Sequence, residues 1–306
     1  MTASSEDVVI PKVSVCVITY NQEKYISRCL ESVINQEVDF PFEIIVGDDC
    51  STDGTRDILL DYAKRYPSLI KLILNEKNVG YRKNYINVHS LARGKYVGHC
   101  DGDDYWYQGK LKGQTEYLDK NPEVSAVFSN AESNNGIKYK PSDCGLFHFE
   151  KILERVFTNF LCVQSSVLER WHDVKAIYEQ EGEVFDFEWH WLKHRNFLVY
   201  VDPVPRLHYE LSPNGVSRQR SFVAQLEPSL ERFRKRGLNA KTLEKIRFDY
   251  EMSKYFSDPA NHKRPSILTA IRFGYGLGLI VRLSAPTAIY HAIKLIRHPE
   301  LKPGMD

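Results

Sequence analysis

Three aspartates fall within four positions directly after an apolar run, in the stretch VGHCDGDDYW at residues 97–106. Asp101, Asp103 and Asp104 would repel one another, and repulsion that no cation relieves costs stability. Their hard oxygen donors suit Mg²⁺ or Mn²⁺, and Gly102 allows a sharp turn between them. A metal shared with a substrate diphosphate would neutralise the charge that grows when the diphosphate departs. The alternative is an acidic turn that caps the next helix.

A second acidic cluster, VGDDCSTDGT at residues 46–55, lacks the patterns that bind phosphate. It does not have the Gly-x4-Gly-Lys spacing of a P-loop, and the chain contains no GxGxxG sequence. Its carboxylates are acceptors, which suit the N–H edge of a uracil-type base or a ribose hydroxyl. Taken alone, Asp53 is better explained as a helix cap.

Short apolar runs alternate with segments of helical periodicity over the first 130 residues. This alternation predicts βαβ units and an α/β fold, with a mainly parallel, Rossmann-like sheet flanked by helices. Ligands of such sheets bind outside the carboxyl ends of the strands. Because a polar cluster follows each predicted strand, we expect all four clusters at one edge. The predicted strands are 13–18, 42–47, 69–74 and 95–100, the helices 23–35, 54–66 and 81–92, and the clusters 19–22, 48–53, 75–84 and 101–104.

Four motifs, in this order and spacing, resemble family 2 glycosyltransferases of the GT-A fold: VCVITYN, VGDDCSTDGT, NVGYRKN and ARGKYVGHCDGDDYW. The resemblance is strong over residues 13–130 and weaker over 184–217. It implies a nucleotide-diphosphate sugar donor, with UDP favoured by family frequency. It also implies a divalent cation, Mn²⁺ or Mg²⁺, and direct displacement with inversion at the anomeric carbon.

The resemblance also assigns site residues. Asp103 would be the principal metal ligand and Asp101 would lie against the ribose or sugar, with Asp101 and His208 as further candidate ligands. The expected nucleotide-sugar contacts are Thr19, Tyr20, Asn21, Asp48, Asp49, Asn78, Gly80, Arg82, Asn84, Asp101, Gly102 and Asp103.

Relatives carry a catalytic base on a long helix, and the corresponding position here is Asp186 in VFDFEWHWL, with Glu188 as the alternative. A displacement needs one carboxylate across the anomeric carbon from the diphosphate, close enough to take the proton of the acceptor hydroxyl. The surrounding aromatic side chains could stack on an acceptor sugar. Alternatively, the helix packs them into the core and Asp186 caps its start. These aromatic residues are Phe185, Phe187, Trp189 and Trp191.

The chain departs from the family near residues 209–217, where Glu210 replaces a usual basic residue for the diphosphate. The Gln-x-x-Arg-Trp motif of processive synthases is absent, so addition of a single sugar is expected. His190 and His194 have a spacing that could bind zinc, but without a zincin pattern we expect ordinary surface or core histidines. Other groups that could assist the metal in binding the diphosphate are Arg82, Lys83, His208, Arg218 and Arg220.

We expect a catalytic domain over residues 1–220 and a helical C-terminal region over 221–306. The catalytic domain divides into a nucleotide-sugar-binding half, 13–130, and an acceptor-side half, 131–220. A long loop is expected at 130–145. Further predictions are a helix over 184–195, strand-like segments from 197 onward, and helices near 221–236 and 240–256.

The C-terminal segment from about 262 to 298 mixes six basic residues with aliphatic and aromatic ones and has no acidic residue. Two amphipathic helices lying on an anionic membrane surface would have this composition. Ordinary helices packed on the catalytic domain are the alternative. If the membrane interpretation holds, the acceptor is a lipid-linked glycan or a lipopolysaccharide precursor.

Composition excludes several classes of protein. With 41 Lys and Arg against 40 Asp and Glu, nothing indicates a nucleic-acid partner. Six scattered cysteines and no signal peptide favour a cytoplasmic protein, peripheral on the inner face of the membrane. The apolar run 273–281 is too short to span a bilayer. Two competing functions remain, a sugar nucleotidyltransferase, which would normally have a Gly-rich phosphate loop, and a non-catalytic nucleotide- or glycan-binding module.

Overall fold

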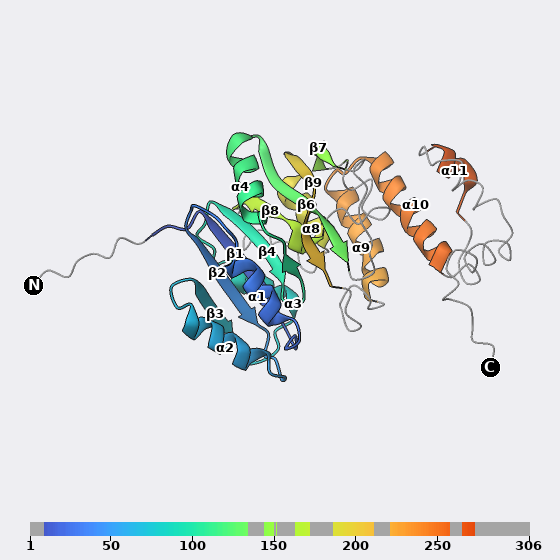
Figure 1. The fold of residues 1–306 in the computed structure, drawn as a ribbon. Coiled ribbons are helices and arrows are strands. Elements are labelled where there is room, and N and C mark those ends of the chain that lie inside the picture. The colour runs from blue at the N-terminus through green and yellow to red at the C-terminus, as the bar shows by residue number, and fades with distance from the viewer. Residues whose placement is uncertain are drawn as a thin grey trace, which may run out of the picture. The chain divides into compact units, whose positions relative to one another are not determined.

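The computed structural model describes residues 9–133, 144–149, 151, 163–171, 186–210, 221–257 and 265–272. The chain divides into two compact units, Met1–Ser229 and Leu230–Asp306. The first unit holds the sheet and the flanking helices (Figure 1). The expected α/β architecture is therefore confirmed, while the assignment of a catalytic domain to 1–220 stays a prediction.

Among the described residues, one sheet is formed by β1 (Val13–Thr19), β2 (Phe42–Asp48), β3 (Ile70–Leu74), β4 (Tyr96–Asp101), β5 (Tyr105–Trp106), β6 (Val124–Ser133), β7 (Gly145–His148), β8 (Leu168–Arg170) and β9 (Leu198–Tyr209). Its order is β3-β2-β1-β4-β8-β6-β9-β5, and β7 pairs with β9. The first four strands along the chain pair in parallel, whereas β8 runs antiparallel to β4 and β6. The parallel part is the half that the motifs predict to bind the donor.

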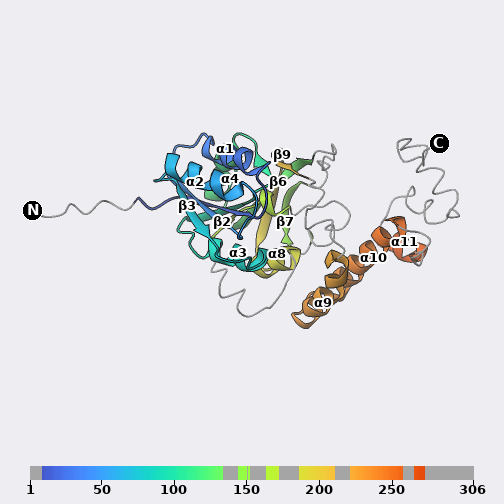
Figure 2. The same cartoon turned by 90° about the horizontal axis from the view of Figure 1, so that it is seen from below.

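Helices cover both faces of the sheet (Figure 2). One face carries α1 (Ile26–Ile34), α2 (Thr55–Arg65) and α4 (Lys110–Lys120), and the other carries α3 (Tyr81–His89) and α8 (Asp186–His194). The helix α9 (Ser221–Lys235) crosses the boundary between the two units. The second unit also contains α10 (Ala240–Ser257) and α11 (Ile267–Arg272).

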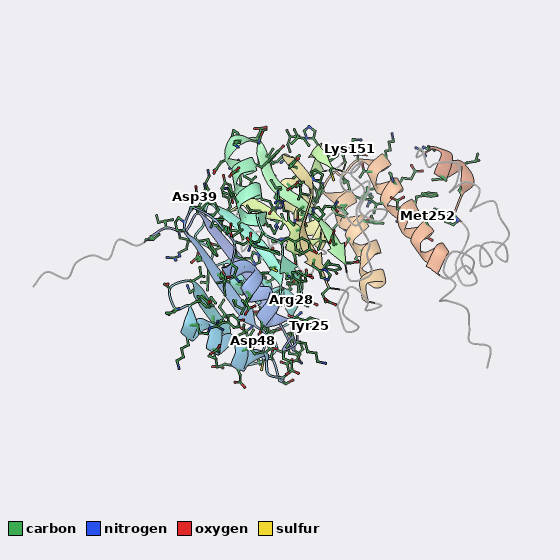
Figure 3. All side chains as sticks on the ribbon, in the orientation of Figure 1. Tyr25, Arg28, Asp39, Asp48, Lys151 and Met252 are labelled. Atoms are coloured by element: carbon green, nitrogen blue, oxygen red, sulfur yellow. The ribbon has the colours of Figure 1, made fainter. Side chains whose placement is uncertain are left out.

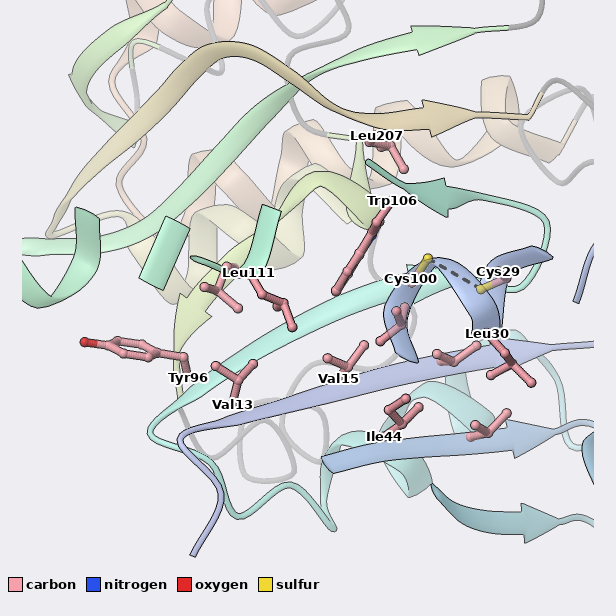
Figure 4. Packing of buried hydrophobic residues seen from close by; sticks show 14 of the residues in the cluster. Val13, Val15, Cys29, Leu30, Ile44, Tyr96, Cys100, Trp106, Leu111 and Leu207 are labelled. Carbon is pink, nitrogen blue, oxygen red and sulfur yellow. Dashed lines mark hydrogen bonds between the residues drawn. The ribbon is translucent and has the colours of Figure 1, made fainter. Parts of the chain in front are cut away.

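The strand β1 shows how both faces of the sheet are buried. Val15 and Val17 pack on the side of α1 and α2, whereas Cys16 and Ile18 pack on the side of α3. Every residue of β1 is buried, and from Val15 to Ile18 the strand is apolar on both faces rather than alternating. Figure 4 shows the packing around Val15, with the thiol sulfurs of Cys29 on α1 and Cys100 on β4 3.6 Å apart.

The strands and helices predicted within the described residues up to 257 are confirmed, with boundaries that differ by up to three residues. The prediction of a loop over 130–145 is wrong at its start, because β6 continues to Ser133. There the backbone pairs with β9, with Ala131 opposite Leu207 and Ser133 opposite Tyr209. Pairing, rather than an apolar pattern, extends this strand. Residues 134–143 lie outside the described residues.

The described part of the C-terminal segment is short. Within residues 262–298, the structure describes residues 265–272. In this stretch Arg272 Nη1 lies 2.8 Å from Glu244 Oε1 on α10. No helix in the described ranges is long and apolar enough to cross a membrane. Contact of this segment with a membrane surface stays a prediction.

A buried lysine joins α4 to the short 3-10 helix η2 (Gln164–Ser166). Lys110 is fully buried, and its Nζ donates hydrogen bonds to Gln114 Oε1 at 2.8 Å and to the carbonyl oxygen of Ser166 at 2.6 Å. Burial lowers the pKa of Lys110 to about 7. The lysine thereby fixes η2, which contacts the acidic turn after β4.

We expect Lys110→Met to change how stability depends on pH. The pKa of an unfolded lysine is about 10.4, so between about pH 7 and pH 10 the folded protein binds fewer protons here than the unfolded chain does. Wild type should therefore gain stability relative to the variant as the pH rises. The difference between their free energies of unfolding should increase by about 2 kcal/mol from pH 7 to pH 9. Urea denaturation measures this difference. Lys112→Met, on the exposed side of α4, is the control, and a flat difference for Lys110→Met contradicts the interpretation.

Candidate active site

The carboxyl ends of the parallel strands meet at one edge of the sheet. Thr19, the last residue of β1, is opposite Asp48, and Asp48 is opposite Leu74 at the end of β3. On the other side of β1, Ile18 is opposite Asp101. The prediction that the four polar clusters share an edge is confirmed, and backbone hydrogen bonds join them.

The two carboxylates that follow each other at the end of β2 are engaged by the protein itself. Asp48 is fully buried, and Arg56 donates two hydrogen bonds to its Oδ2 at 2.8 and 2.9 Å (Figure 3 labels Asp48). Asp49 accepts hydrogen bonds from the backbone N–H groups of Val79 at 2.7 Å and Gly80 at 2.9 Å. The bonds of Asp49 fix the loop before α3, and those of Asp48 hold Arg56 of α2, so both aspartates form part of the wall of the candidate site.

Three asparagines expected to contact the donor also hold backbone. Asn84 is buried, and its Nδ2 donates to the carbonyl oxygen of Gly47 at 2.9 Å. Asn21 Oδ1 accepts a hydrogen bond from Thr52 N at 2.7 Å, and Asn78 Oδ1 accepts one from the N–H two residues later at 3.1 Å. The motif residues around this edge therefore organise its loops.

Other predicted donor contacts are more accessible. The side chain of Tyr20 is 45% exposed, and Arg82 is partly exposed at the start of α3.

Two nearby side chains are held by the protein itself. Thr19 is buried and its hydroxyl donates to Gln22 Oε1 at 2.8 Å. Asp53 binds the first N–H of α2, since its Oδ1 accepts from Thr55 N at 3.0 Å, in keeping with the helix-cap interpretation.

The three aspartates of the turn after β4 differ in environment. Asp104 is buried, its Oδ1 accepts a hydrogen bond from Glu210 N at 2.8 Å, and burial raises its pKa well above the usual range. Burial, followed by the charge of Asp101, raises the pKa of Asp103 to about 7. The side chain of Asp101 is 29% exposed. Asp101 and Asp103 are thus the pair left for a ligand.

A divalent cation fits this pair. The two carboxylates supply hard oxygen atoms of the kind that Mg²⁺ and Mn²⁺ prefer. The raised pKa of Asp103 means that its negative charge is unfavourable in a buried place beside Asp101. A bound cation would make that charge favourable. Asp103 and Asp101 are the residues that would hold the metal.

An aromatic and charged group lies beside the acidic turn. Tyr105 on β5 is opposite His208 on β9, and their rings stack with centroids 4.6 Å apart. The Arg28 guanidinium lies 4.2 Å from the Tyr105 ring centroid and its Nη2 is 3.1 Å from Glu210 Oε2 (Figure 3 labels Arg28). Sequence reasoning missed Arg28, because no motif contains it. In the sequence, only the acidic residue at position 210 indicated that a basic side chain would lie beside it.

His208 itself lies close to Glu210, with Nε2 3.7 Å from Oε2. Burial lowers the pKa of His208, which favours the neutral imidazole that can bind a metal. Its role as a metal ligand stays a prediction.

The helix that carries the candidate base begins at Asp186. The side chains of Asp186 and Glu188, and all of Phe185, lie outside the described residues. Trp189 and Trp191 are 2% and 1% exposed, so these two aromatic residues pack in the core and are not available to an acceptor sugar. For them the core interpretation holds.

A buried ionic group anchors α8. Lys193 Nζ is 2.6 Å and His194 Nε2 is 2.9 Å from the carboxylate of Glu169 on β8. Burial opposes the charged form, but Lys193 and then His194 hold the pKa of Glu169 well below its usual range. One ligand atom from each of Glu169, His190 and His194 lies within 4.8 Å of the other two. Because Lys193 already neutralises Glu169, we interpret the two histidines as core residues, one of the two expected alternatives.

We expect Gly102→Ala to disturb the acidic turn. An added Cβ would lie 2.5 Å from Gln22 Oε1 and 2.9 Å from the Cβ of Thr19, which is fixed close to the backbone. Overpacking of this kind should lower the free energy of unfolding by about 2 kcal/mol, measured by chemical denaturation. The control is Gly113→Ala in α4, whose Cβ would meet only the end of the flexible Arg206 side chain. Equal effects of the two changes would contradict the tight packing of the turn.

The family model for glycosyl transferase family 2 matches residues 14–170, just over half of the chain. The chain belongs to this family, and its sheet, with helices on both faces and an acidic turn after β4, is a GT-A fold.

Two curated relatives match shorter stretches. The uncharacterized protein Rv1520 of Mycobacterium tuberculosis is 46% identical over 116 residues, which cover 38% of this chain and 34% of the relative. The putative teichuronic acid biosynthesis glycosyltransferase TuaG of Bacillus subtilis is 40% identical over 119 residues, which cover 39% of this chain and 45% of the relative. The chain thus spans less than half the length of these relatives.

Solved structures resemble most of the chain at low sequence identity. TarS 1-349 of S. aureus, in complex with UDP-GlcNAc, has a TM-score of 0.62 at 21% identity, covering 87% of this chain and 77% of that one. The mannosyltransferase PcManGT of Pyrobaculum calidifontis, in complex with GDP-Man and Mn²⁺, has a TM-score of 0.58 at 18% identity, covering 94% and 81%. These likenesses support the fold.

Proposed function

We propose that the protein is a metal-dependent inverting glycosyltransferase that moves one sugar from a nucleotide-diphosphate sugar to a glycan acceptor. The observation that carries this proposal is the pair Asp101 and Asp103. Both lie at the edge where the parallel strands end, and the environment of Asp103 favours a bound cation. Membership of glycosyl transferase family 2 supports the reaction class.

The donor is a nucleotide-diphosphate sugar, with UDP as the favoured nucleotide. TarS, which shares the fold, binds UDP-GlcNAc, and PcManGT binds GDP-Man with Mn²⁺. The base and ribose occupy the edge beside Thr19 and Tyr20, with Asp48 and Asp49 in the wall behind. The diphosphate lies beside Asp101 and Asp103, which would hold the divalent cation that offsets its charge.

The departing diphosphate needs positive charge. A bound Mn²⁺ or Mg²⁺ neutralises much of it when present. Arg28 offsets the negative charge of Glu210 beside the acidic turn, where Glu210 and the ring of Tyr105 hold its guanidinium. Arg28 therefore compensates for the acidic residue at position 210.

The acceptor hydroxyl attacks the anomeric carbon from the side opposite the diphosphate. The new C–O bond forms as the bond to the diphosphate oxygen breaks, and the hydroxyl proton passes to a carboxylate. Asp186 at the start of α8 is the proposed base, with Glu188 as the alternative. The buried contacts of Glu169 with Lys193 and His194 keep this helix in place.

The acceptor is a cell-surface glycan precursor, lipid-linked and met at the cytoplasmic face of the membrane. The similarity to TuaG, named for teichuronic acid biosynthesis, supports a polysaccharide precursor. The basic and apolar composition of residues 262–298 supports peripheral contact with an anionic membrane.

Asp103→Asn tests the metal and donor site. The variant keeps the size of the side chain but removes one charge, so thermal stabilisation by a nucleotide sugar with Mn²⁺ should disappear. Without ligand, the variant should be at least as stable as wild type, because repulsion within the turn is reduced. Thermal-shift measurements use UDP-, GDP-, dTDP- and CMP-sugars, each with Mn²⁺ and with EDTA.

The matched control is Asp61→Asn on α2, where the side chain is 62% exposed. This variant should respond to donors as wild type does. If no donor stabilises wild type, or if stabilisation survives in Asp103→Asn, the proposed donor site is wrong. Donor binding without any turnover would favour a non-catalytic binding module.

Asp186→Asn and Glu188→Gln separate the two candidate bases. Loss of the base should lower kcat by about 10²–10⁴-fold while the KM for the donor changes little, because the base acts on the acceptor hydroxyl. Initial rates at saturating donor and acceptor measure the effect. We expect the loss in Asp186→Asn and near-wild-type rates in Glu188→Gln, and the reverse result would move the role to Glu188.

A further inference from the structure

We propose that His99 is a positioning residue that holds the carboxylate of Asp101 in the orientation that binds the metal and the donor. The inference rests on the function proposed above and names a residue outside the motif aspartates. His99 lies two residues before Asp101 on β4, so both side chains project from the same face of the strand. His99 is 1% exposed and reaches the site through Asp101.

The first observation is a direct contact. His99 Nε2 lies 3.0 Å from Asp101 Oδ1. A carboxylate that binds a metal only accepts hydrogen bonds, so in the metal-binding arrangement Nε2 is the donor. The other ring nitrogen, Nδ1, is buried and has no hydrogen-bond partner among the described residues. A buried nitrogen without a hydrogen-bond partner costs stability, so a histidine is a poor choice for filling space alone. The bond from Nε2 to Asp101 is an interaction that an apolar ring could not make.

The second observation is that the other oxygen of Asp101 is also held. Ser165 Oγ lies 3.4 Å from Asp101 Oδ2 and accepts a hydrogen bond from Asp101 N at 2.9 Å. Ser165 belongs to η2, which Lys110 fixes through the carbonyl oxygen of Ser166. With one partner at each oxygen, the carboxylate has a defined orientation before any ligand binds.

The third observation is that neighbouring rings hold the imidazole. The rings of Tyr85 and His89 on α3 have centroids 5.0 and 5.2 Å from that of His99. The hydroxyl of Tyr85 accepts a hydrogen bond from Gln164 Nε2 at 2.9 Å. Trp189 on α8 meets Tyr85 edge to face, with centroids 6.3 Å apart. The contacts that orient His99 therefore also seat the helix that begins at the candidate base.

Removing the N–H donor while keeping an aromatic ring tests the inference. In His99→Phe the ring still packs beside Tyr85 and His89, but Asp101 Oδ1 loses its partner. Isothermal titration calorimetry of the full chain with UDP and with GDP, each with Mn²⁺, should give about tenfold weaker binding of the nucleotide that wild type binds, a change of about 1.4 kcal/mol. The concentration of Mn²⁺ needed at saturating nucleotide should rise with it.

Two further variants separate positioning from packing. His99→Gln retains an N–H donor and should recover most of the affinity. His89→Phe changes a ring of the same stack that does not contact Asp101, and its affinity should match wild type. If circular dichroism shows that His99→Phe is unfolded, His99→Met takes its place, because methionine is flexible and fills irregular gaps without an N–H donor.

The outcomes distinguish this inference from the proposed function. Wild-type affinity in His99→Phe, or an equal loss in His89→Phe, overturns the positioning role and leaves the glycosyltransferase proposal intact. If wild type binds neither nucleotide with Mn²⁺, the proposed donor site is wrong, and the positioning role falls with it.

Discussion

Repulsion among carboxylates at the end of β4 is the constraint around which the site is built. The protein buries Asp104 against the backbone N–H of Glu210 and holds both oxygens of Asp101. Asp103 lies beside them, and burial together with the charge of Asp101 raises its pKa to about 7. The surrounding elements serve this arrangement, since η2 supplies Ser165 and Glu210, the residue after β9, supplies the N–H for Asp104. A turn that is unfavourable by itself thus becomes an organised place for a cation.

Local patterns in the sequence were sufficient to predict the parallel half of the fold. Buried strands, amphipathic helices and the polar residues after each strand are properties of neighbouring residues, and parallel pairing then brings the strand ends together. What could not be predicted depends on distant segments. The bond between Glu210 N and Asp104 joins positions 106 residues apart, and Lys110 meets the carbonyl of Ser166 56 residues away. No periodicity reports such contacts.

A sequence motif predicts where a residue lies in the fold more reliably than it predicts which group its side chain binds. The similarity to the family predicts that Asp49 and Asn84 contact the donor, but in the structure Asp49 holds the N–H groups of Val79 and Gly80 and Asn84 holds the carbonyl oxygen of Gly47 on β2. The aromatic residues of α8 show the same limit, because a helix-period pattern does not distinguish a buried tryptophan from one that faces a ligand. Trp189 and Trp191 are in the core. Burial of a side chain is decided by what packs against it.

The internal bonding of the wall residues has a consequence for engineering the protein. Changing Asp48, Asp49 or Asn84 would remove hydrogen bonds to Arg56, to the loop before α3 or to β2, so substitutions at these positions should lower stability. Tyr20 is 45% exposed at the same edge. Diversity introduced at this tyrosine would alter the surface of the candidate site while the hydrogen bonds of Asp48, Asp49 and Asn84 remain.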